Sequence, residues 1–420
     1  MPPPPAKWKG RCDFNRSVCN NKLIGARSFY ESAKWRWEGI DDPVLPIDDS
    51  AHGTHVSSTA VGAFVPGANA MGSGFGTAAG MAPRAHLAFY QVCFVGKGCD
   101  RDDILAAIDD ALDEGIDVLS MSLGADDAGD FAADPIALGG FSSVMRGVFV
   151  CTSAGNQGPS PATVANEAPW LLTVAAATTD RTFSADVNYV SVQQPLVRDT
   201  AADGTCSDKT VLTAQHVAGK IVLCISGGNL TNLEKGSILH DAGAIAMIIV
   251  LPEDVGSVIS PKAHALPATQ VEAKWSEKIM AYVNSTQSPT AQLVFRGAVL
   301  GNRMAPVVAP FSSRGPSRQN QGILKPDITG PGVNIIAAVP MPNGLAQPPN
   351  EMAYKDVNQV QTFTVTIRTK DGQKMKERIA EGQLKWVSRK HVVRSPILVS
   401  SKKFFKENSM ANNGQRVGDS

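Results

Sequence analysis

The sequence predicts an α/β protein built on a parallel sheet with helices packed against it. Two observations lead to this fold class. Between about residues 80 and 180, short β-rich runs alternate with runs of helical periodicity, as in the crossover units of a parallel sheet. The composition, with 43% hydrophobic and 19% charged residues in a chain of 420, is typical of a protein with a buried core and not of a disordered one.

The elements of this core follow one another along the chain. Residues 85–92 are expected to form a strand. Residues 102–114 are expected to form a helix, because acidic residues stand in its first turn, Gly115 can end it and its apolar residues form one stripe. That stripe consists of Ile104, Ala107, Ile108, Ala111 and Leu112. Further elements are a buried strand at 116–121, a helix at 135–145, and strands at 147–151 and 171–176.

The sequence changes character twice after this core. Between residues 190 and 297, short strands at 220–224 and 246–250 flank a helical segment near 233–242, which predicts a separate inserted module. Residues 298–340 return to core-like sequence punctuated by Gly and Pro. The last part is expected to be all-β, because it alternates strictly at 362–367, has the turn pair Asp371-Gly372, and has further strand-like runs. Those runs lie at 384–387 and 397–399.

The charge balance excludes some classes of partner. Lys plus Arg and Asp plus Glu number 39 each, so neither nucleic acid nor an anionic membrane surface is expected as a partner. Residues 368–406 are basic, which a solvated strand face explains more often than a polyanion site. The longest apolar stretches, 242–251 and 169–177, have about ten residues, about half the length of a membrane span. Because no Walker or GxGxxG motif and no zinc-type cysteine spacing occurs, neither an organic cofactor nor a metal is expected.

The features that report on export disagree with one another. The chain starts with Met1 and four prolines and has no apolar core of the kind found in a secretory signal. Its seven cysteines fall as three pairs of modest spacing plus one left over, which is typical of an extracellular disulfide set.

One histidine stands in a sequence suited to proton transfer. His52 precedes a run of small and apolar residues and should lie in the first turn of a helix. A helix amino terminus disfavours a resting imidazolium, and Gly53 lets other backbone approach, both of which suit a general base. A capping histidine and half of a metal site are the alternatives, although no third metal ligand lies nearby in the sequence.

Two strand ends carry residues suited to holding a peptide. Residues 119–124 (Leu-Ser-Met-Ser-Leu-Gly) end one expected strand with side chains small enough for a peptide backbone to lie alongside. Residues 153–158 (Ser-Ala-Gly-Asn-Gln-Gly) end the next strand, where the amide of Asn156 can donate a hydrogen bond to a developing oxyanion. Taken alone, each segment is more often a simple turn at a strand end.

The order and spacing of these segments resemble those of the subtilisin-like serine proteases, and most of all the plant subtilases, over roughly residues 6 to 340. Further matching segments are residues 8–12 (Trp-Lys-Gly-Arg-Cys), 21–27 (Asn-Lys-Leu-Ile-Gly-Ala-Arg), 80–83 (Gly-Met-Ala-Pro), 311–316 (Phe-Ser-Ser-Arg-Gly-Pro) and 325–328 (Lys-Pro-Asp-Ile). The resemblance implies that His52 is the general base and Asn156 the oxyanion donor. It also implies a cleft for the residue before the scissile bond, lined by Ser122, Leu123, Gly124, Ala154 and Gly155. Substrates would then be peptides or proteins.

The resemblance implies a division of the chain as well. Residues 1–189 and 298–350 would be the two parts of a subtilisin-like catalytic domain, the second of them truncated. Residues 190–297 would be an inserted protease-associated domain, and residues 351–420 part of a fibronectin type III-like β domain. An extracellular location, in the cell wall or apoplast, is implied too, whereas no oligomeric state is predicted. By the resemblance, the disulfides would be Cys12–Cys19, Cys93–Cys99 and Cys206–Cys224, with Cys151 free.

Two members of the family's catalytic triad are missing from the sequence. The aspartate should end a strand well upstream of His52, but the available aspartates follow no such strand. These are Asp13, Asp41, Asp42, Asp48 and Asp49. The serine of a Gly-Thr-Ser-Met motif should come soon after residues 331–335, but the chain runs directly into the final β module. Ser409 is a faint echo of that motif in a polar tail, and Ser312 and Ser313 belong to a different segment.

Acyl transfer by this mechanism needs a nucleophile, a base and a group that orients the base. In subtilisin, a member of the family that the chain resembles, loss of the serine alone lowers kcat by a factor of about 2 × 10⁶. We therefore expect this polypeptide to be a pseudoenzyme. Loss of the serine helix should also uncover several apolar side chains, each worth about 1.5–3 kcal/mol when buried, so we expect low stability. The alternatives are a non-catalytic binding protein for peptides and a fragment of a longer, active, secreted protease.

Overall fold

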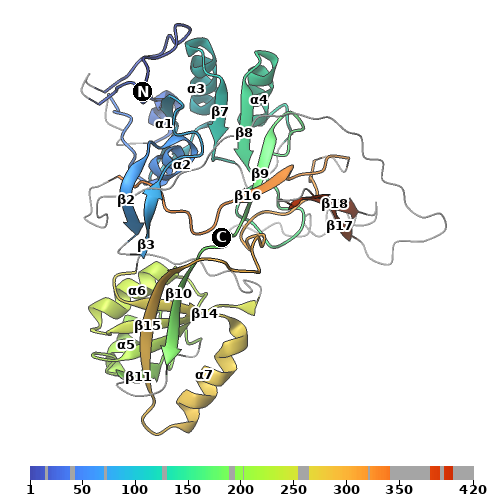
Figure 1. Cartoon of the computed structure of the whole chain (residues 1–420). Coiled ribbons are helices and arrows are strands. Elements are labelled where there is room, and N and C mark those ends of the chain that lie inside the picture. Colours follow the sequence, from blue (N-terminus) through green and yellow to red (C-terminus); the bar gives the residue numbers. More distant parts are fainter. Residues whose placement is uncertain are drawn as a thin grey trace, which may run out of the picture.

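The structure is a computed structural model. It describes residues 1–14, 18–37, 43–70, 73–124, 130–188, 194–201, 203–253, 264–319, 322–340, 379–387 and 392–400. One group of sheets and helices fills the upper part of Figure 1, and a further sheet with its own helices lies below it. Among the helices of the described residues, none combines the length and the apolar character needed to cross a membrane.

A small parallel sheet forms near the amino terminus. It pairs β1 (Leu23–Ser28) with β4 (Leu87–Gln91). Between these strands the chain forms α1 (Glu31–Arg36), α2 (His52–Val61) and an antiparallel hairpin of β2 (Val65–Ala70) and β3 (Ser73–Ala78). After β4 come the two-residue strands β5 (Cys93–Phe94) and β6 (Gly98–Cys99).

A second parallel sheet has the order β16-β9-β8-β7 among the described strands. Its strands are β7 (Val118–Met121), β8 (Phe149–Ser153), β9 (Leu172–Ala177) and β16 (Ile328–Pro331). The parallel pairing confirms the α/β fold class expected from the sequence. The strands expected at 116–121, 147–151 and 171–176 correspond to β7, β8 and β9.

Two helices cover one face of this second sheet. They are α3 (Arg101–Glu114) and α4 (Pro135–Met145), and both agree closely with the helices expected from the sequence. The side chain of Asp100 caps α3, and Gly115 ends it with a φ of 93°, which favours glycine. Asp134 caps α4, whose first residue is a proline. Ile104, Ile108 and Ile136 of these helices pack with Val150 of the sheet in one core.

The opposite face of the second sheet is open among the described residues. Val118 is 59% exposed, Phe149 55% and Ile328 53%. The register pairs Val118 with Phe149, so their side chains lie side by side. Val150 faces the helices instead and is only 2% exposed. The sheet therefore has one covered face and one apolar face in contact with solvent.

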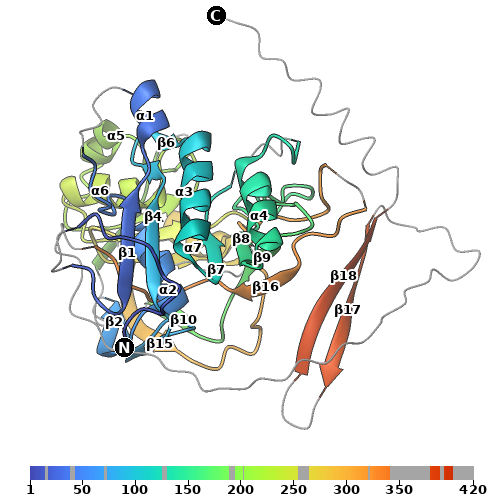
Figure 2. The same ribbon diagram turned by 90° about the horizontal axis from the view of Figure 1, so that it is seen from above.

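The two parallel sheets are separate, although one helix serves both. α3 connects β4, through the short strands β5 and β6, to β7, yet β4 and β7 belong to different sheets. α3 lies between β4 and β7 in Figure 2. Tyr90 of β4 and Leu119 of β7 both pack against the core that contains α3. The helix thus joins two sheets that share no described hydrogen-bonded ladder.

The third sheet forms the lower part of the molecule in Figure 1. Its order is β10-β15-β11-β12-β13-β14 among the described strands. The strands are β10 (Thr182–Asn188), β11 (Gln194–Arg198), β12 (Ile221–Ile225), β13 (Ala246–Val250), β14 (Ala268–Val271) and β15 (Thr290–Val299). The helices α5 (Lys209–Ala214), α6 (Asn232–Asp241) and α7 (Ala273–Ser285) accompany it. This sheet begins at Thr182, before the boundary at residue 190 that the sequence suggested.

A lysine is sealed inside this third unit. Lys235 of α6 is fully buried, and its Nζ donates to the carbonyl oxygens of Ile225 at 3.0 Å and Gly227 at 2.5 Å. Burial lowers the pKa of Lys235, and the nearby carboxylates of Asp203 and Asp199 act against that shift. The ammonium is thereby held at the end of β12.

The expectations for the tail and the cysteines have different outcomes. β17 (Ile379–Val387) and β18 (Val392–Ser400) form an antiparallel pair that includes the strands expected at 384–387 and 397–399. The alternation at 362–367 and the Asp371-Gly372 turn lie outside the described residues. The disulfide prediction is confirmed in all three pairs, Cys12–Cys19, Cys93–Cys99 and Cys206–Cys224, and Cys151 is free.

Candidate functional site

The candidate base stands at the start of a helix, as the sequence predicted. α2 begins at His52, after Ala51 in a left-handed conformation with φ 67°. The imidazole of His52 is exposed and forms no hydrogen bond with any residue that the structure describes. Its backbone N–H donates to Oγ of Ser50 at 3.2 Å. The ring is therefore accessible from solvent, but no described carboxylate orients it.

One of the sequence candidates for such a carboxylate, Asp48, has another role. Oδ2 of Asp48 accepts a hydrogen bond from the backbone N–H of Thr54 at 2.7 Å. Its Oδ1 accepts two more from Ser50, from the backbone N–H and from the hydroxyl, each at 3.1 Å. Burial alone would raise the pKa of Asp48, but the hydrogen bonds from Thr54 and Ser50 outweigh it and lower the pKa. Asp48 thus fixes the turn that leads into α2.

α2 is anchored on two sides. A Cβ added to Gly53 would lie 2.8 Å from Cζ of Phe89, so a larger residue there would force the ring of Phe89 in β4 to shift. On its other side, the ring of His55 lies 3.3 Å from the carbonyl oxygen of Ile335, and the N–H of Ala338 donates to Oγ of Ser58 at 2.9 Å. The segment that follows β16 therefore holds the helix that carries His52.

The two candidate binding segments lie next to each other in the structure. β7 and β8 are neighbouring parallel strands, and their ladder ends at the pair of Met121 and Thr152. Residues Ser122, Leu123 and Gly124 continue from β7, while Ala154, Gly155 and Asn156 continue from β8. Both segments thus leave the carboxyl edge of the same sheet, where parallel α/β proteins commonly bind ligands.

The segment after β8 is held by a loop from far along the chain. The N–H of Gly158 donates to the carbonyl oxygen of Phe311 at 2.9 Å, and the N–H of Ser313 donates to that of Gly155 at 3.0 Å. Oγ of Ser313 accepts from the N–H of Gln157 at 2.9 Å. Asn156 lies within this fixed turn with an exposed side chain that has no described hydrogen-bond partner. Its amide is accordingly available to a ligand.

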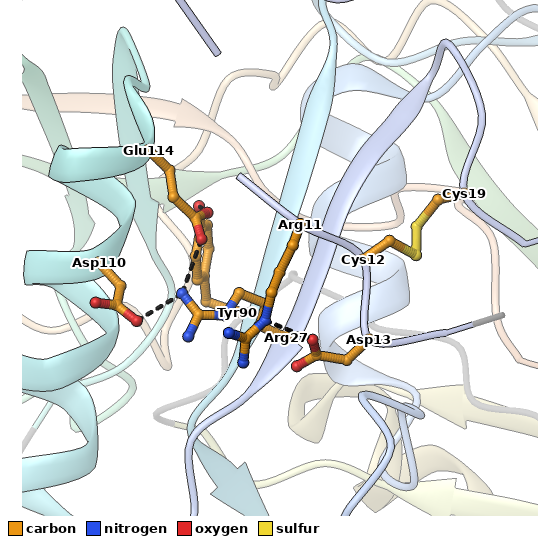
Figure 3. A network of polar contacts seen from close by, with 8 residues as sticks. All are labelled: Arg11, Cys12, Asp13, Cys19, Arg27, Tyr90, Asp110 and Glu114. Carbon is orange, nitrogen blue, oxygen red and sulfur yellow. Dashed lines mark hydrogen bonds and ion pairs between the residues drawn. A yellow bond between two sulfur atoms is a disulfide. The ribbon is translucent and has the colours of Figure 1, made fainter. Parts of the chain in front are cut away.

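A network of charges joins the first sheet to α3 (Figure 3). Nη1 of Arg27 lies 2.5 Å from Oδ2 of Asp110 and 2.7 Å from Oε1 of Glu114, whose other oxygen accepts from the hydroxyl of Tyr90. Burial alone would lower the pKa of Arg27, but the hydrogen bonds and charges of Asp110 and Glu114 outweigh it and raise the pKa. Burial and the bond to Glu114 raise the pKa of Tyr90. The network fastens β1 and β4, and hence the support of α2, to α3.

Metal binding finds no support in the described part of the chain. Within it, no group of three or more His, Cys, Asp or Glu side chains is placed to hold a metal ion. His52 is therefore not accompanied there by the other ligands that a metal site needs.

Comparisons with known proteins decide the family. The model of the subtilase family matches residues 11–376, which is most of the chain. The chain belongs to the subtilase family. Subtilisin-like protease SBT1.7 of Arabidopsis thaliana is 41% identical to this subtilase over 387 residues, which cover 85% of this chain and 51% of that protein. Subtilisin-like protease SBT5.4 of the same plant is 42% identical over 365 residues, covering 80% of this chain and 46% of that protein.

This subtilase spans about half the length of the curated relatives it matches. A solved structure, the psychrophilic subtilisin-like protease Apa1 from Pseudoalteromonas sp. AS-11, covers 72% of this chain and 76% of its own. The two share 16% identity with a TM-score of 0.33, which is too low to support an argument about the site.

Two polar residues at the site of this subtilase were not singled out from its sequence. Asn166 is 7% exposed, and its Nδ2 donates to the carbonyl oxygens of Leu123 at 2.7 Å and Ser153 at 2.9 Å. The next residue, Glu167, is also buried and accepts hydrogen bonds from the backbone of Arg318 and Gln319. The signal available in the sequence was a polar pair inside an otherwise apolar run, which calls for buried partners.

Proposed function

We propose that this subtilase polypeptide keeps a peptide-holding cleft and a general base but does not hydrolyse peptide bonds. The observation that carries the proposal is the state of His52, whose imidazole has no hydrogen-bond partner among the described residues. A histidine base needs a carboxylate to fix its orientation and a hydroxyl to deprotonate. Since neither lies beside His52 among the described residues, we expect no acyl transfer through this ring.

Two buried serines in the segment 311–316, Ser312 and Ser313, also support the proposal. Oγ of Ser312 accepts from the N–H of Ala176 at 3.0 Å, and Oγ of Ser313 accepts from the N–H of Gln157 at 2.9 Å. Both side chains are 1% exposed. The hydroxyl of Ser312 is bound to β9 and that of Ser313 to the turn that carries Asn156, so neither is placed as a nucleophile.

We assign the remaining roles by family. His52 is the base and Asn156 the oxyanion donor, and the cleft is formed by Ser122, Leu123, Gly124, Ala154 and Gly155. Peptides or proteins are the ligands. Residues 190–297 correspond to a protease-associated domain, residues 351–420 to part of a fibronectin type III-like domain, and the expected location is extracellular.

The absence of hydrolysis is tested with a fluorophosphonate probe, which labels activated serines. The purified chain and its His52→Ala variant are incubated with the probe beside active subtilisin as the positive control. We expect the parent to be labelled no more than the variant, and to release no product from a mixture of fluorogenic peptides. Labelling of the parent that disappears in the variant would show a working nucleophile and end the proposal.

A second candidate is that the protein acts by holding peptides. It is favoured by the strand ends after β7 and β8, which are fixed by contacts to residues 310–313 and 166 without help from any triad member. A pull-down with immobilised peptides tests this second candidate.

A third candidate is that a longer, active and secreted product exists. Long-read sequencing of transcripts across the codons for residues 338–352 and upstream of Met1 distinguishes this candidate from the first.

A further inference from the structure

We infer that Asn166 is a positioning residue that sets the distance between the two segments proposed to hold a peptide. The inference rests on the proposed peptide-holding function and concerns the same cleft. It assigns to Asn166 no contact with the ligand and no part in chemistry.

The amide of Asn166 joins two segments where their backbone ladder has stopped. The last ladder pair between β7 and β8 is Met121 with Thr152. Beyond it, the carbonyl oxygens of Leu123 and Ser153 are both bound by Nδ2 of Asn166, at 2.7 and 2.9 Å. A primary amide nitrogen has two hydrogens, and each is used by one of the two segments. The width of the gap between them is therefore fixed by one nitrogen atom.

The position of Asn166 is itself fixed by its backbone conformation and by a contact with β9. Its backbone has a φ of 53°, a left-handed conformation that asparagine adopts more readily than most residues. The hydroxyl of Thr173, in β9, donates to its carbonyl oxygen at 2.6 Å. With 7% exposure, the side chain has little space for another rotamer. The amide is thus held by β9 through Thr173, and also by the segment after β8, where the carbonyl oxygen of Ala154 accepts from the N–H of Ala165 at 2.8 Å.

The residue before it lies against both segments. A Cβ added to Gly124 would lie 3.1 Å from Nδ2 of Asn166 and 3.4 Å from Cβ of Ala165. A Cβ added to Gly155 would lie 3.3 Å from the same Ala165 atom. Because both glycines face this pair, a shift of Asn166 moves the walls on both sides of the proposed cleft. A change in the amide should therefore alter which side chain the cleft accepts.

The test compares substitutions that differ in shape and in hydrogen bonding. Asn166→Asp keeps the shape but replaces the donor by a carboxylate that faces two carbonyl oxygens. Asn166→Gly removes the amide and accepts the positive φ, so it remains informative if the aspartate variant fails to fold. Asn232→Asp, at an asparagine of α6 whose amide bonds Oγ of Ser226, makes the same charge change far from the strand ends.

The full chain and its variants are titrated with fluorescein-labelled tetrapeptide amides that differ only in a final Ala, Leu or Phe. Binding is followed by fluorescence anisotropy below the lowest melting temperature of the set. We expect both Asn166 variants to bind about tenfold more weakly, which equals about 1.4 kcal/mol, and to lose the parent's preference among the three peptides. The Asn232 variant should match the parent in both respects.

Three outcomes would count against these ideas in different ways. Asn166 variants with a lower melting temperature but the parent's affinities and preference would show a purely structural residue and overturn the inference alone. The same loss in the Asn232 variant would trace the effect to charge and overturn it as well. A parent that binds none of the peptides would refute the peptide-holding function and the positioning role together.

Discussion

The exposure of one face of the second sheet can be tested by placing the same substitution at an exposed and at a buried position. Val118 is 59% exposed on that face, and Val150 is 2% exposed on the face covered by α3 and α4. Val→Thr exchanges a methyl group for a hydroxyl and keeps the branched shape that strands favour. Burying a hydroxyl without a partner costs about 1–3 kcal/mol in proteins, whereas exposed substitutions usually change stability by about 0.5 kcal/mol or less.

The free energy of unfolding is measured by urea denaturation of the parent and the two single variants. We expect Val150→Thr to lower it by about 1–3 kcal/mol and Val118→Thr by about 0.5 kcal/mol or less. Equal losses above about 1 kcal/mol at both positions would mean that the face bearing Val118 is covered in solution. Repeating the titration at several protein concentrations would then show whether a second copy covers it, because association makes stability depend on concentration.

Three further predictions concern single features of the fold. Arg27→Ala leaves the carboxylate of Glu114 without its cation and should lower the free energy of unfolding in urea by about 3–5 kcal/mol. Glu114→Gln should lower it less in the Arg27→Ala background than in the parent. Equal losses in the two backgrounds would contradict the coupling between Arg27 and Glu114. Replacing both Cys206 and Cys224 by Ala should lower the free energy of unfolding by about 3 kcal/mol, the value for a loop of about this length; a change below about 1 kcal/mol would show that the disulfide adds little. The lowered pKa of Asp48 means that its contribution to stability is present above the unfolded pKa of about 3.9 and is lost as the pH falls through the folded pKa. Asp48→Asn should therefore reduce the acid-induced drop in melting temperature below about pH 4, and an unchanged drop would contradict this.

The sequence predicts best the elements whose signals are local. α3 agrees because its acidic first turn, its apolar stripe and Gly115 all lie within one stretch of chain. α4 agrees because an aspartate and a proline mark its start. The disulfide pairs, by contrast, followed from the family resemblance.

What the sequence did not reveal depends on contacts between distant segments. Asn166 bonds the carbonyl oxygens of Leu123, after β7, and Ser153, in β8, which no sequence pattern brings together. The turn that carries Asn156 is held by Ser313, 156 positions from its partner Gln157. β10 and β15 were missed as a pair because they are more than a hundred residues apart in the chain, and their pairing at Asp186 and Val294 is a property of the folded module. Separation of this kind hides a contact from any local reading of the sequence.

The buried ammonium of Lys235 can be used to follow the local opening of the unit built on the third sheet. Acylating reagents modify an amine only when it is deprotonated and accessible, and this one is enclosed while it donates to the carbonyl oxygens of Ile225 and Gly227. Its reaction with such a reagent must wait for α6 to separate from β12. The rate of that modification, followed by mass spectrometry, would thus record how often this unit opens under native conditions.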